Sequence, residues 1–193
     1  MIKKNRHMSK KLDIGCIFLR DYKASFTGRE VARLADVSPQ TAITELDSLL
    51  NEKIVLCERE GRNNRYSLNV TDLRGKVFLQ MMEIVRSRLF LDDLELREII
   101  NFILPLAEVV IVFGSFAKSR KKDHSDLDML IINGREEKVR EAKQIFPREL
   151  HVEFVNWKQF SDAFRNKKAL ALEIQKDHVI YGNIYKVVEV YCS

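Results

Sequence analysis

Two short apolar runs in the second half of the chain constrain its fold more than any other feature. Val109–Phe113 contains no polar residue, and Leu127–Ile132 contains a single aspartate. Runs of this length are typical of strands buried on both faces of a sheet. Helical and strand patterns alternate after them. We therefore predict an α/β half with strands at 109–113, 127–132 and 150–155, helices at about 135–145, 157–164 and 169–176, and a terminal segment at 178–181.

The composition is that of an ordinary globular protein. Of the 193 residues, 46% are hydrophobic and 32% charged, with only 7 glycines and 3 prolines, which excludes collagen-like, low-complexity and wholly disordered chains. Every apolar run is far shorter than the roughly 20 residues that span a bilayer. No apolar stretch follows the basic N-terminus, so we expect a cytoplasmic protein with no membrane partner. The three widely spaced cysteines predict buried free thiols.

The first third of the chain has the pattern of short helices followed by a hairpin. Thr27 can cap one helix, and Ser38 followed by Pro39 is a typical N-cap and first residue of the next. The hairpin is indicated by two strand-like segments on either side of turn-forming residues. We predict helices over residues 10–23, 29–34 and 38–52, and strands over 54–58 and 65–68.

This order resembles a winged helix-turn-helix domain, and the stretch from Arg29 to Ala42 has the spacing of that family. The resemblance covers roughly residues 10–70. It implies that the second helix of the motif enters the major groove of duplex DNA and that the hairpin touches the backbone. The DNA-binding residues implied in this way are Ser38, Gln40, Thr41, Thr44, Arg62 and Arg65.

The charge of this region leaves a second interpretation open. Residues 1–75 carry 14 Lys and Arg against 10 Asp and Glu, whereas residues 76–193 carry 19 against 18. A basic front end fits a polyanionic partner. In the helix that the resemblance places in the groove, however, Glu45 and Asp47 repel phosphates. Winged-helix domains also serve as protein-interaction or dimerisation modules, and this alternative remains.

Residues 76–104 connect the two halves and are rich in large apolar side chains. Two helices are predicted, at about 76–90 and 93–104. The first has apolar residues on more than one face, so we expect it to be buried between domains or between subunits. The resulting division is a DNA-binding domain at 1–75, connecting helices at 76–104, which could form a homodimer interface, and an α/β domain at 105–193.

Two aspartates mark the second apolar strand. Asp126 lies at its start and Asp128 two positions later, so both carboxylates project from the same face. A carboxylate pair beside an apolar strand is costly unless a cation lies between them. Oxygen ligands suit Mg²⁺ (or Mn²⁺), which binds one or two carboxylates together with substrate phosphates. The pair therefore predicts a metal site.

A glycine and a serine end the first apolar strand, ten residues before Asp126. Gly114 lets the backbone approach a ligand closely, and free amides with the Ser115 hydroxyl can hold phosphate oxygens. The intervening segment includes Lys118 and Arg120, cations able to meet a triphosphate. These four residues are the predicted nucleotide-binding set.

Together, Gly114-Ser115, the ten-residue spacing and the Asp126–Asp128 pair resemble the nucleotidyltransferase signature of the DNA polymerase β-like superfamily, especially its small stand-alone members. The resemblance covers about residues 95–182. It implies a mixed-sheet fold and transfer of a nucleotidyl group from a nucleoside triphosphate, with two metal ions held by acidic residues. Ser119 departs from the pattern, because many small members have glycine there.

The family pattern also implies a third acid on the strand after the following helix. Glu153 is the only acid within strand 150–155, so Asp126, Asp128 and Glu153 are the implied catalytic and metal-binding residues. Glu149 is the competitor, expected to face solvent at the start of the strand. His124 and His151 are expected to be ordinary surface or core residues.

The sequence thus predicts an α+β chain of two domains: a winged helix-turn-helix domain and a nucleotidyltransferase enzyme with an unknown acceptor. Two alternatives stay open. In one, the chain is a DNA-binding transcriptional regulator whose second domain senses a nucleotide without turnover. In the other, it resembles antitoxins that nucleotidylate a partner protein.

Overall fold

The computed structural model describes residues 9–118 and 126–193, and the chain in it divides into two compact units. One is built mainly from residues up to Met82, the other from Glu83 to Tyr191. The long helix α4 (Leu73–Phe90) contributes its first part to one unit and its last part to the other. None of the helices within the described ranges is long and apolar enough to cross a membrane.

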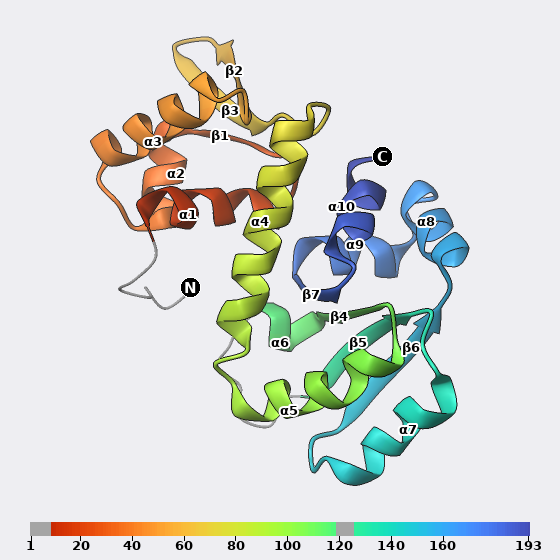
Figure 1. The fold of residues 1–193 in the computed structure, drawn as a ribbon. Helices are drawn as coiled ribbons and strands as arrows, with labels where there is room; N and C mark the ends of the chain where they lie inside the picture. The colour runs from red at the N-terminus through yellow and green to blue at the C-terminus, as the bar shows by residue number, and fades with distance from the viewer. Residues whose placement is uncertain (1–8, 119–125) are drawn as a thin grey trace. The chain divides into compact units, whose positions relative to one another are not determined.

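The first unit combines three helices, a 3₁₀ segment and a small antiparallel sheet of order β1-β3-β2 (Figure 1). Thr27 caps α2 through a reciprocal capping box with Glu30, and Ser38 caps α3, as the sequence predicts. The elements are α1 (Lys10–Gly15), η1 (Cys16–Arg20), β1 (Ser25–Thr27), α2 (Gly28–Ala35), α3 (Pro39–Asn51), β2 (Val55–Glu60) and β3 (Asn63–Leu68).

Two local predictions differ from this structure. The expected helix over residues 10–23 is shorter, because α1 gives way to a 3₁₀ turn at Cys16 that ends at Arg20. The strand β1 was not expected, since three residues carry no periodic signal of their own. It forms by antiparallel pairing with β3, which is a tertiary contact.

The second unit is built on a mixed sheet of order β6-β5-β4-β7, so the chain is an α+β protein. β4 pairs antiparallel with both β5 and β7, while β5 and β6 are parallel. The elements after α4 are α5 (Leu94–Ile103), η2 (Leu104–Leu106), β4 (Val109–Phe113), α6 (Gly114–Lys118), β5 (Leu127–Ile132), α7 (Glu136–Ile145), β6 (Leu150–Val155), α8 (Trp157–Arg165), α9 (Ala169–Lys176), β7 (His178–Gly182) and α10 (Ile184–Cys192).

The two faces of this sheet have different surroundings. Val110, Met129 and Ile131 pack with buried residues of α5 and α7 in the main core cluster. The opposite face carries one row of paired residues that runs across all four strands. Its members are His151 on β6, Asp128 on β5, Phe113 on β4 and His178 on β7. This row brings one carboxylate and two histidines into a mostly apolar sheet.

Candidate active site

Gly114 and Asp128 are in direct contact where β4 ends. Phe113 pairs with Asp128 across the antiparallel strands, and Gly114 follows it with φ +71°. A Cβ at Gly114 would lie 2.3 Å from Asp128 Oδ2, closer than any side chain tolerates. Glycine is therefore required twice, for its positive φ and for the space that the carboxylate occupies. The space left by the missing side chain is filled by a site residue of the same chain.

Asp128 is only partly exposed, and its charge is disfavoured there. Burial raises the pKa of the Asp128 carboxyl above its ordinary value, with Asp126 and Glu173 adding to the rise while His151 opposes it. Two further carboxylates thus act on Asp128 close to the start of β5. A bound cation would relieve both the burial and the repulsion.

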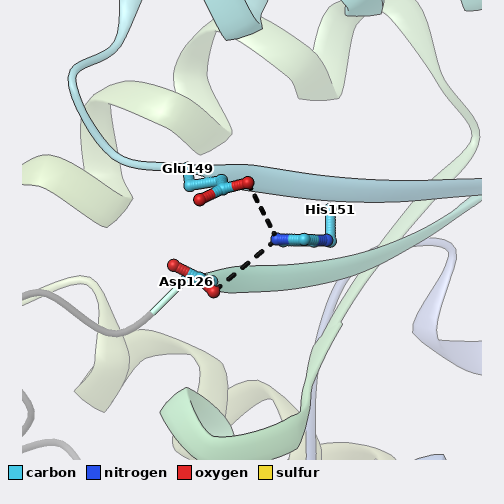
Figure 2. A group of neighbouring side chains, drawn as sticks. All are labelled: Asp126, Glu149 and His151. Atoms are coloured by element: carbon cyan, nitrogen blue, oxygen red, sulfur yellow. Dashed lines mark ion pairs between the residues drawn. The ribbon is translucent and has the colours of Figure 1, made fainter.

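Asp126, Glu149 and His151 form an exposed cluster where β5 and β6 begin (Figure 2). His151 Nε2 lies 3.6 Å from Asp126 Oδ2 and 3.4 Å from Glu149 Oε1. One ligand atom from each residue can be chosen so that all three lie within 4.8 Å of one another. The parallel pairing explains the placement, because Leu127 N–H donates to Glu149 O over 2.9 Å. Asp126, Glu149 and His151 are a possible metal site.

Glu153 lies farther along β6. It pairs in register with Leu130, two residues beyond the Asp128–His151 pair, and is exposed. Side chains alternate along a strand, so Glu153 projects from the same face as His151 and Asp128. Among the described residues, the group of potential ligands around Asp126 consists of Glu149 and His151. These are the two residues that the sequence assigned to solvent and to an ordinary surface or core position.

The predicted phosphate-binding residues are only partly within the described chain. Ser115 and Lys118 are exposed in the five-residue helix α6, directly after Gly114. Arg120 falls in 119–125, outside the described residues, as do Ser119 and His124. Gly114, Ser115 and the aspartate pair thus come from the adjacent ends of two paired strands, β4 and β5.

A second acid–histidine cluster, which the sequence did not reveal, is fully buried in the same unit. His178 Nε2 lies 3.1 Å from Glu83 Oε1, and both side chains are 0% exposed. The other ring nitrogen contacts Ile174 O over 2.9 Å. The ring also meets Tyr191 edge-on. Burial, with the Glu83 charge adding, holds the pKa of Tyr191 well above its ordinary value.

The candidate DNA-binding residues all lie in the first unit. Some of their side chains are exposed, and others make hydrogen bonds within the chain. Gln40 and Arg62 are exposed, at the start of α3 and at the tip of the β2–β3 turn. Arg65 instead ties the sheet together, because its guanidinium donates to Ser25 Oγ over 2.9 Å and to Ser25 O over 2.6 Å. The hydroxyls are used locally as well: Ser38 accepts from Thr41 N–H, and Thr44 donates to Gln40 O.

Comparison with known proteins finds a family match, which lies within the second unit. Residues 94–183 match the family model of the nucleotidyltransferase domain. The matched region runs from α5 to the end of β7 and contains Gly114, Ser115 and the cluster around Asp126. The match supports a nucleotidyl transfer activity, with a nucleoside triphosphate as substrate.

The other comparisons add no functional information. No curated protein matches the chain. A solved structure of TrmBL2, described as an archaeal chromatin protein with a novel mode of DNA binding, is 16% identical and covers 88% of this chain and 73% of its own, with a TM-score of 0.29. A TM-score of this size is too low to establish a shared fold, so the likeness does not bear on whether this chain binds DNA.

Proposed function

We propose that the second unit transfers a nucleotidyl group from a nucleoside triphosphate to an acceptor, with Asp126, Asp128 and Glu153 as its catalytic acids. The observation that carries the proposal is the packing of Asp128 against Gly114, inside the region that matches the nucleotidyltransferase family model. This contact joins the glycine–serine turn and the aspartate pair in one site. A turn alone would explain the positive φ of Gly114, but it would not explain why a carboxylate occupies the space where a Cβ would lie.

The residues present fit a divalent metal such as Mg²⁺ or Mn²⁺. The burial and the neighbouring carboxylates that raise the pKa of Asp128 are relieved when a cation is bound. Asp126 is exposed, which suits an ion that keeps several water ligands. In this proposal Asp126, Asp128 and Glu153 would hold the metal. When bound, the metal supplies charge neutralisation at the triphosphate and lowers the pKa of the attacking group.

The chain's own residues have distinct roles in the proposed reaction. Ser115 and the Gly114 backbone, with Lys118 and Arg120, bind the triphosphate oxygens. An acceptor oxygen or nitrogen attacks the α-phosphorus, the bond to the β-phosphate oxygen breaks, and pyrophosphate leaves with its electron pair. The acceptor's proton passes to a carboxylate of the site, for which Glu153 is the candidate. Atoms balance as nucleotidylated acceptor, pyrophosphate and one proton.

Position-specific labelling tests this proposal. Purified full-length protein is incubated with nucleoside triphosphate labelled at either the α- or the γ-phosphate, Mg²⁺ and an acceptor pool that includes small molecules, protein and RNA. We expect label to move to an acceptor from the α-phosphate only, and Asp126→Asn and Asp128→Asn to abolish the transfer. Glu137→Gln, on the exposed side of α7, is the matched control.

The same assay separates the alternatives. Transfer to a co-purified or supplied protein supports the antitoxin-like interpretation of the acceptor. Metal-dependent binding of the triphosphate without transfer to any acceptor would contradict the enzyme and favour a nucleotide-sensing regulator. Equal binding with and without metal, in wild type and in Asp128→Asn, would exclude both.

For the first unit we propose winged-helix binding to duplex DNA. The supporting observation is that α2, α3 and the β2–β3 hairpin follow in the order of that fold, with Gln40 and Arg62 exposed. Full-length protein is mixed with a random duplex pool, and we expect binding that weakens steeply with salt, because phosphate contacts release counterions. Arg62→Ala should lower the affinity. Absence of a shift at low salt favours the protein-interaction alternative.

The proposed homodimer through residues 76–104 has a specific basis in α4. Val77, Met81 and Ile84 are exposed at helical spacing, with 43%, 50% and 56% of their surfaces accessible. Apolar side chains at such spacing form one stripe along a helix. Sedimentation analysis of wild type and Met81→Glu tests the dimer, which the charged side chain should dissociate.

A further inference from the structure

We propose that Asp126, Glu149 and His151 form a binding site for a divalent transition-metal ion of the Mn²⁺, Co²⁺ and Zn²⁺ class, distinct in ligand type from an all-carboxylate magnesium site. The inference shares Asp126 with the proposed function but does not require nucleotidyl transfer. Asp126 directly precedes β5, Glu149 directly precedes β6, and His151 is the second residue of β6. The two strands pair in parallel. All three side chains are exposed.

The distances within the cluster fit a shared ion better than hydrogen bonds. His151 Nε2 lies 3.4 Å from Glu149 Oε1 and 3.6 Å from Asp126 Oδ2. Protein N–H···O hydrogen bonds are about 2.7–3.2 Å long. Two ligands that each lie about 2.1 Å from one metal ion are separated by about 3.0 Å at adjacent octahedral positions and about 3.4 Å at tetrahedral ones. The two separations from His151 are close to the tetrahedral value, and the carboxylate oxygens of Asp126 and Glu149 lie within 4.8 Å of each other.

The histidine decides the class of ion. Mg²⁺ prefers oxygen ligands and dehydrates reluctantly, whereas imidazole nitrogen suits Zn²⁺ and the other transition metals. Two carboxylates with one imidazole are a donor set that such ions accept, with water completing the coordination. The side chains of His151, Asp126 and Glu149 are 53%, 57% and 70% exposed, which leaves the ion accessible to water or to a substrate oxygen.

The backbone holds the three residues together without help from their side chains. Leu127 pairs with Leu150 and Asp128 with His151, and the Leu127 N–H donates to Glu149 O. Because β5 and β6 are central and edge strands of one sheet, Asp126 and Glu149 remain neighbours whether or not an ion is bound.

The competing account is an ion pair between a protonated His151 and the two carboxylates. If the cluster is only such an ion pair, its three residues bind no divalent ion. Direct binding measurements on the tag-free full-length protein, stripped with a chelator and kept free of nucleotide, separate the two. Bound Mn²⁺ is measured by the loss of the free-ion paramagnetic resonance signal, Co²⁺ by its visible absorption, and Mg²⁺ by competition against Mn²⁺.

The variants are His151→Gln, Glu149→Gln and Asp126→Asn, with Glu153→Gln as the discriminating neighbour and Glu137→Gln as the exposed control. We expect each of the first three to weaken Mn²⁺ and Co²⁺ binding about tenfold or more, since even outer-shell partners of metal ligands contribute about 10–100-fold. His151→Gln should change the affinity for Mg²⁺ far less than that for Co²⁺.

Three outcomes would overturn the inference. They are the absence of Mn²⁺ and Co²⁺ binding to wild type, unchanged binding in both His151→Gln and Glu149→Gln, and a larger loss in Glu153→Gln than in His151→Gln. The last outcome assigns the ion to the Asp126, Asp128 and Glu153 set instead. Transfer of the α-phosphate label in Mg²⁺ is measured separately. If the wild-type protein binds Co²⁺ but transfers no label, only the proposed function is contradicted.

Discussion

Two acid–histidine clusters lie at opposite edges of one sheet in the second unit, and their environments differ in almost every respect. His151 and His178 occupy the two ends of the same row of paired residues, on β6 and β7. His178 and its partner Glu83 are completely buried, in hydrogen-bond contact at 3.1 Å. His151 is half exposed, 3.4 Å and 3.6 Å from its carboxylates.

The hydrogen-bonding protons of the buried cluster indicate that it has a structural role. Ile174 O can only accept, so the His178 Nδ1 that contacts it carries a proton. The contact between Nε2 and Glu83 needs one further proton, whether it resides on the ring or on the carboxyl group. Both ring nitrogens are thereby used inside the protein. The exposed His151 keeps its Nε2 facing two carboxylates at distances that leave room for an ion.

The largest effect is expected from breaking the buried pair. Glu83→Ala leaves His178 buried without its carboxylate, and removing one member of a buried pair costs about 3–5 kcal/mol. Urea unfolding of the full-length chain, followed by a signal from the second unit, measures the loss. The matched control is Glu149→Ala in the exposed cluster. Equal losses in the two variants would contradict the distinction between the clusters.

The second prediction concerns Gly114, which follows Phe113 of the row and packs against the Asp128 carboxylate. Gly114→Ala places a methyl group against the Asp128 carboxylate and forces a positive φ on a residue with a Cβ. We expect a loss of about 1–3 kcal/mol, which such a backbone strain costs, together with a loss of metal-dependent triphosphate binding. Thermal unfolding and calorimetry measure the two.

Gly61→Ala is the control for this prediction. Gly61 has a similar positive φ, +60°, but apart from its two chain neighbours no described residue has an atom within 4 Å of its Cβ position. It therefore reports the backbone strain alone, and the excess loss in Gly114→Ala measures the displacement of Asp128. Equal losses, with triphosphate binding retained in Gly114→Ala, would mean that the contact with Asp128 has no role in the site.

The sheet of the second unit could be predicted from the sequence because its strands are marked locally. Strands at 109–113, 127–132 and 150–155 are confirmed at these bounds. The first two are almost wholly apolar runs, and the third alternates apolar residues with His151 and Glu153. Helix α10 was missed, although its buried residues Val187, Val188 and Tyr191 lie at helical spacing. β1 was missed because only its pairing with β3 makes it a strand.

For the candidate site, the sequence predicts which side chains share a face of each strand, but not which residues of the two strands meet. Period-two alternation places Asp126 and Asp128 on one face, and Glu149, His151 and Glu153 on one face of the next strand. Which of the latter three meets Asp126 depends on the register between β5 and β6, and a single sequence does not contain it. The Glu83–His178 contact joins residues 95 positions apart, so local patterns carry no signal for it.

The third prediction concerns Asp128 and the direction in which its charge changes the free energy of unfolding. Because burial raises the pKa of Asp128, the folded chain keeps this proton to a higher pH than the unfolded chain does. Stability is therefore lost as pH rises from the ordinary Asp value, about 3.9, through the raised one, and the loss persists at neutral pH. Without metal, Asp128→Asn should be more stable than wild type at neutral pH.

Solvent around this partly exposed carboxylate limits the gain to below about 1 kcal/mol, or roughly 2–4 °C in Tm for a chain of this length. Thermal unfolding between neutral pH and about pH 4 measures it, and the gain should shrink toward the acid end. Glu137→Gln, which removes an exposed carboxylate on α7, is the control. A destabilised Asp128→Asn variant in metal-free buffer would mean that the charge is favoured in the fold.

The smallest effect is expected from the exposed cluster in the absence of metal. His151→Gln and Glu149→Gln remove partners that are half or more exposed and lie beyond hydrogen-bond distance, so each should change the free energy of unfolding by less than about 0.5 kcal/mol. An ion that binds only the folded chain adds stability, about 2.7 kcal/mol at a hundredfold excess over its Kd. Wild type should therefore gain this stabilisation from Mn²⁺, measured by thermal unfolding, while both variants at the same Mn²⁺ concentration gain much less. If instead the metal-free variants lose as much stability as Glu83→Ala, then the exposed cluster is a structural pair like the buried one, and exposure does not distinguish the two histidines.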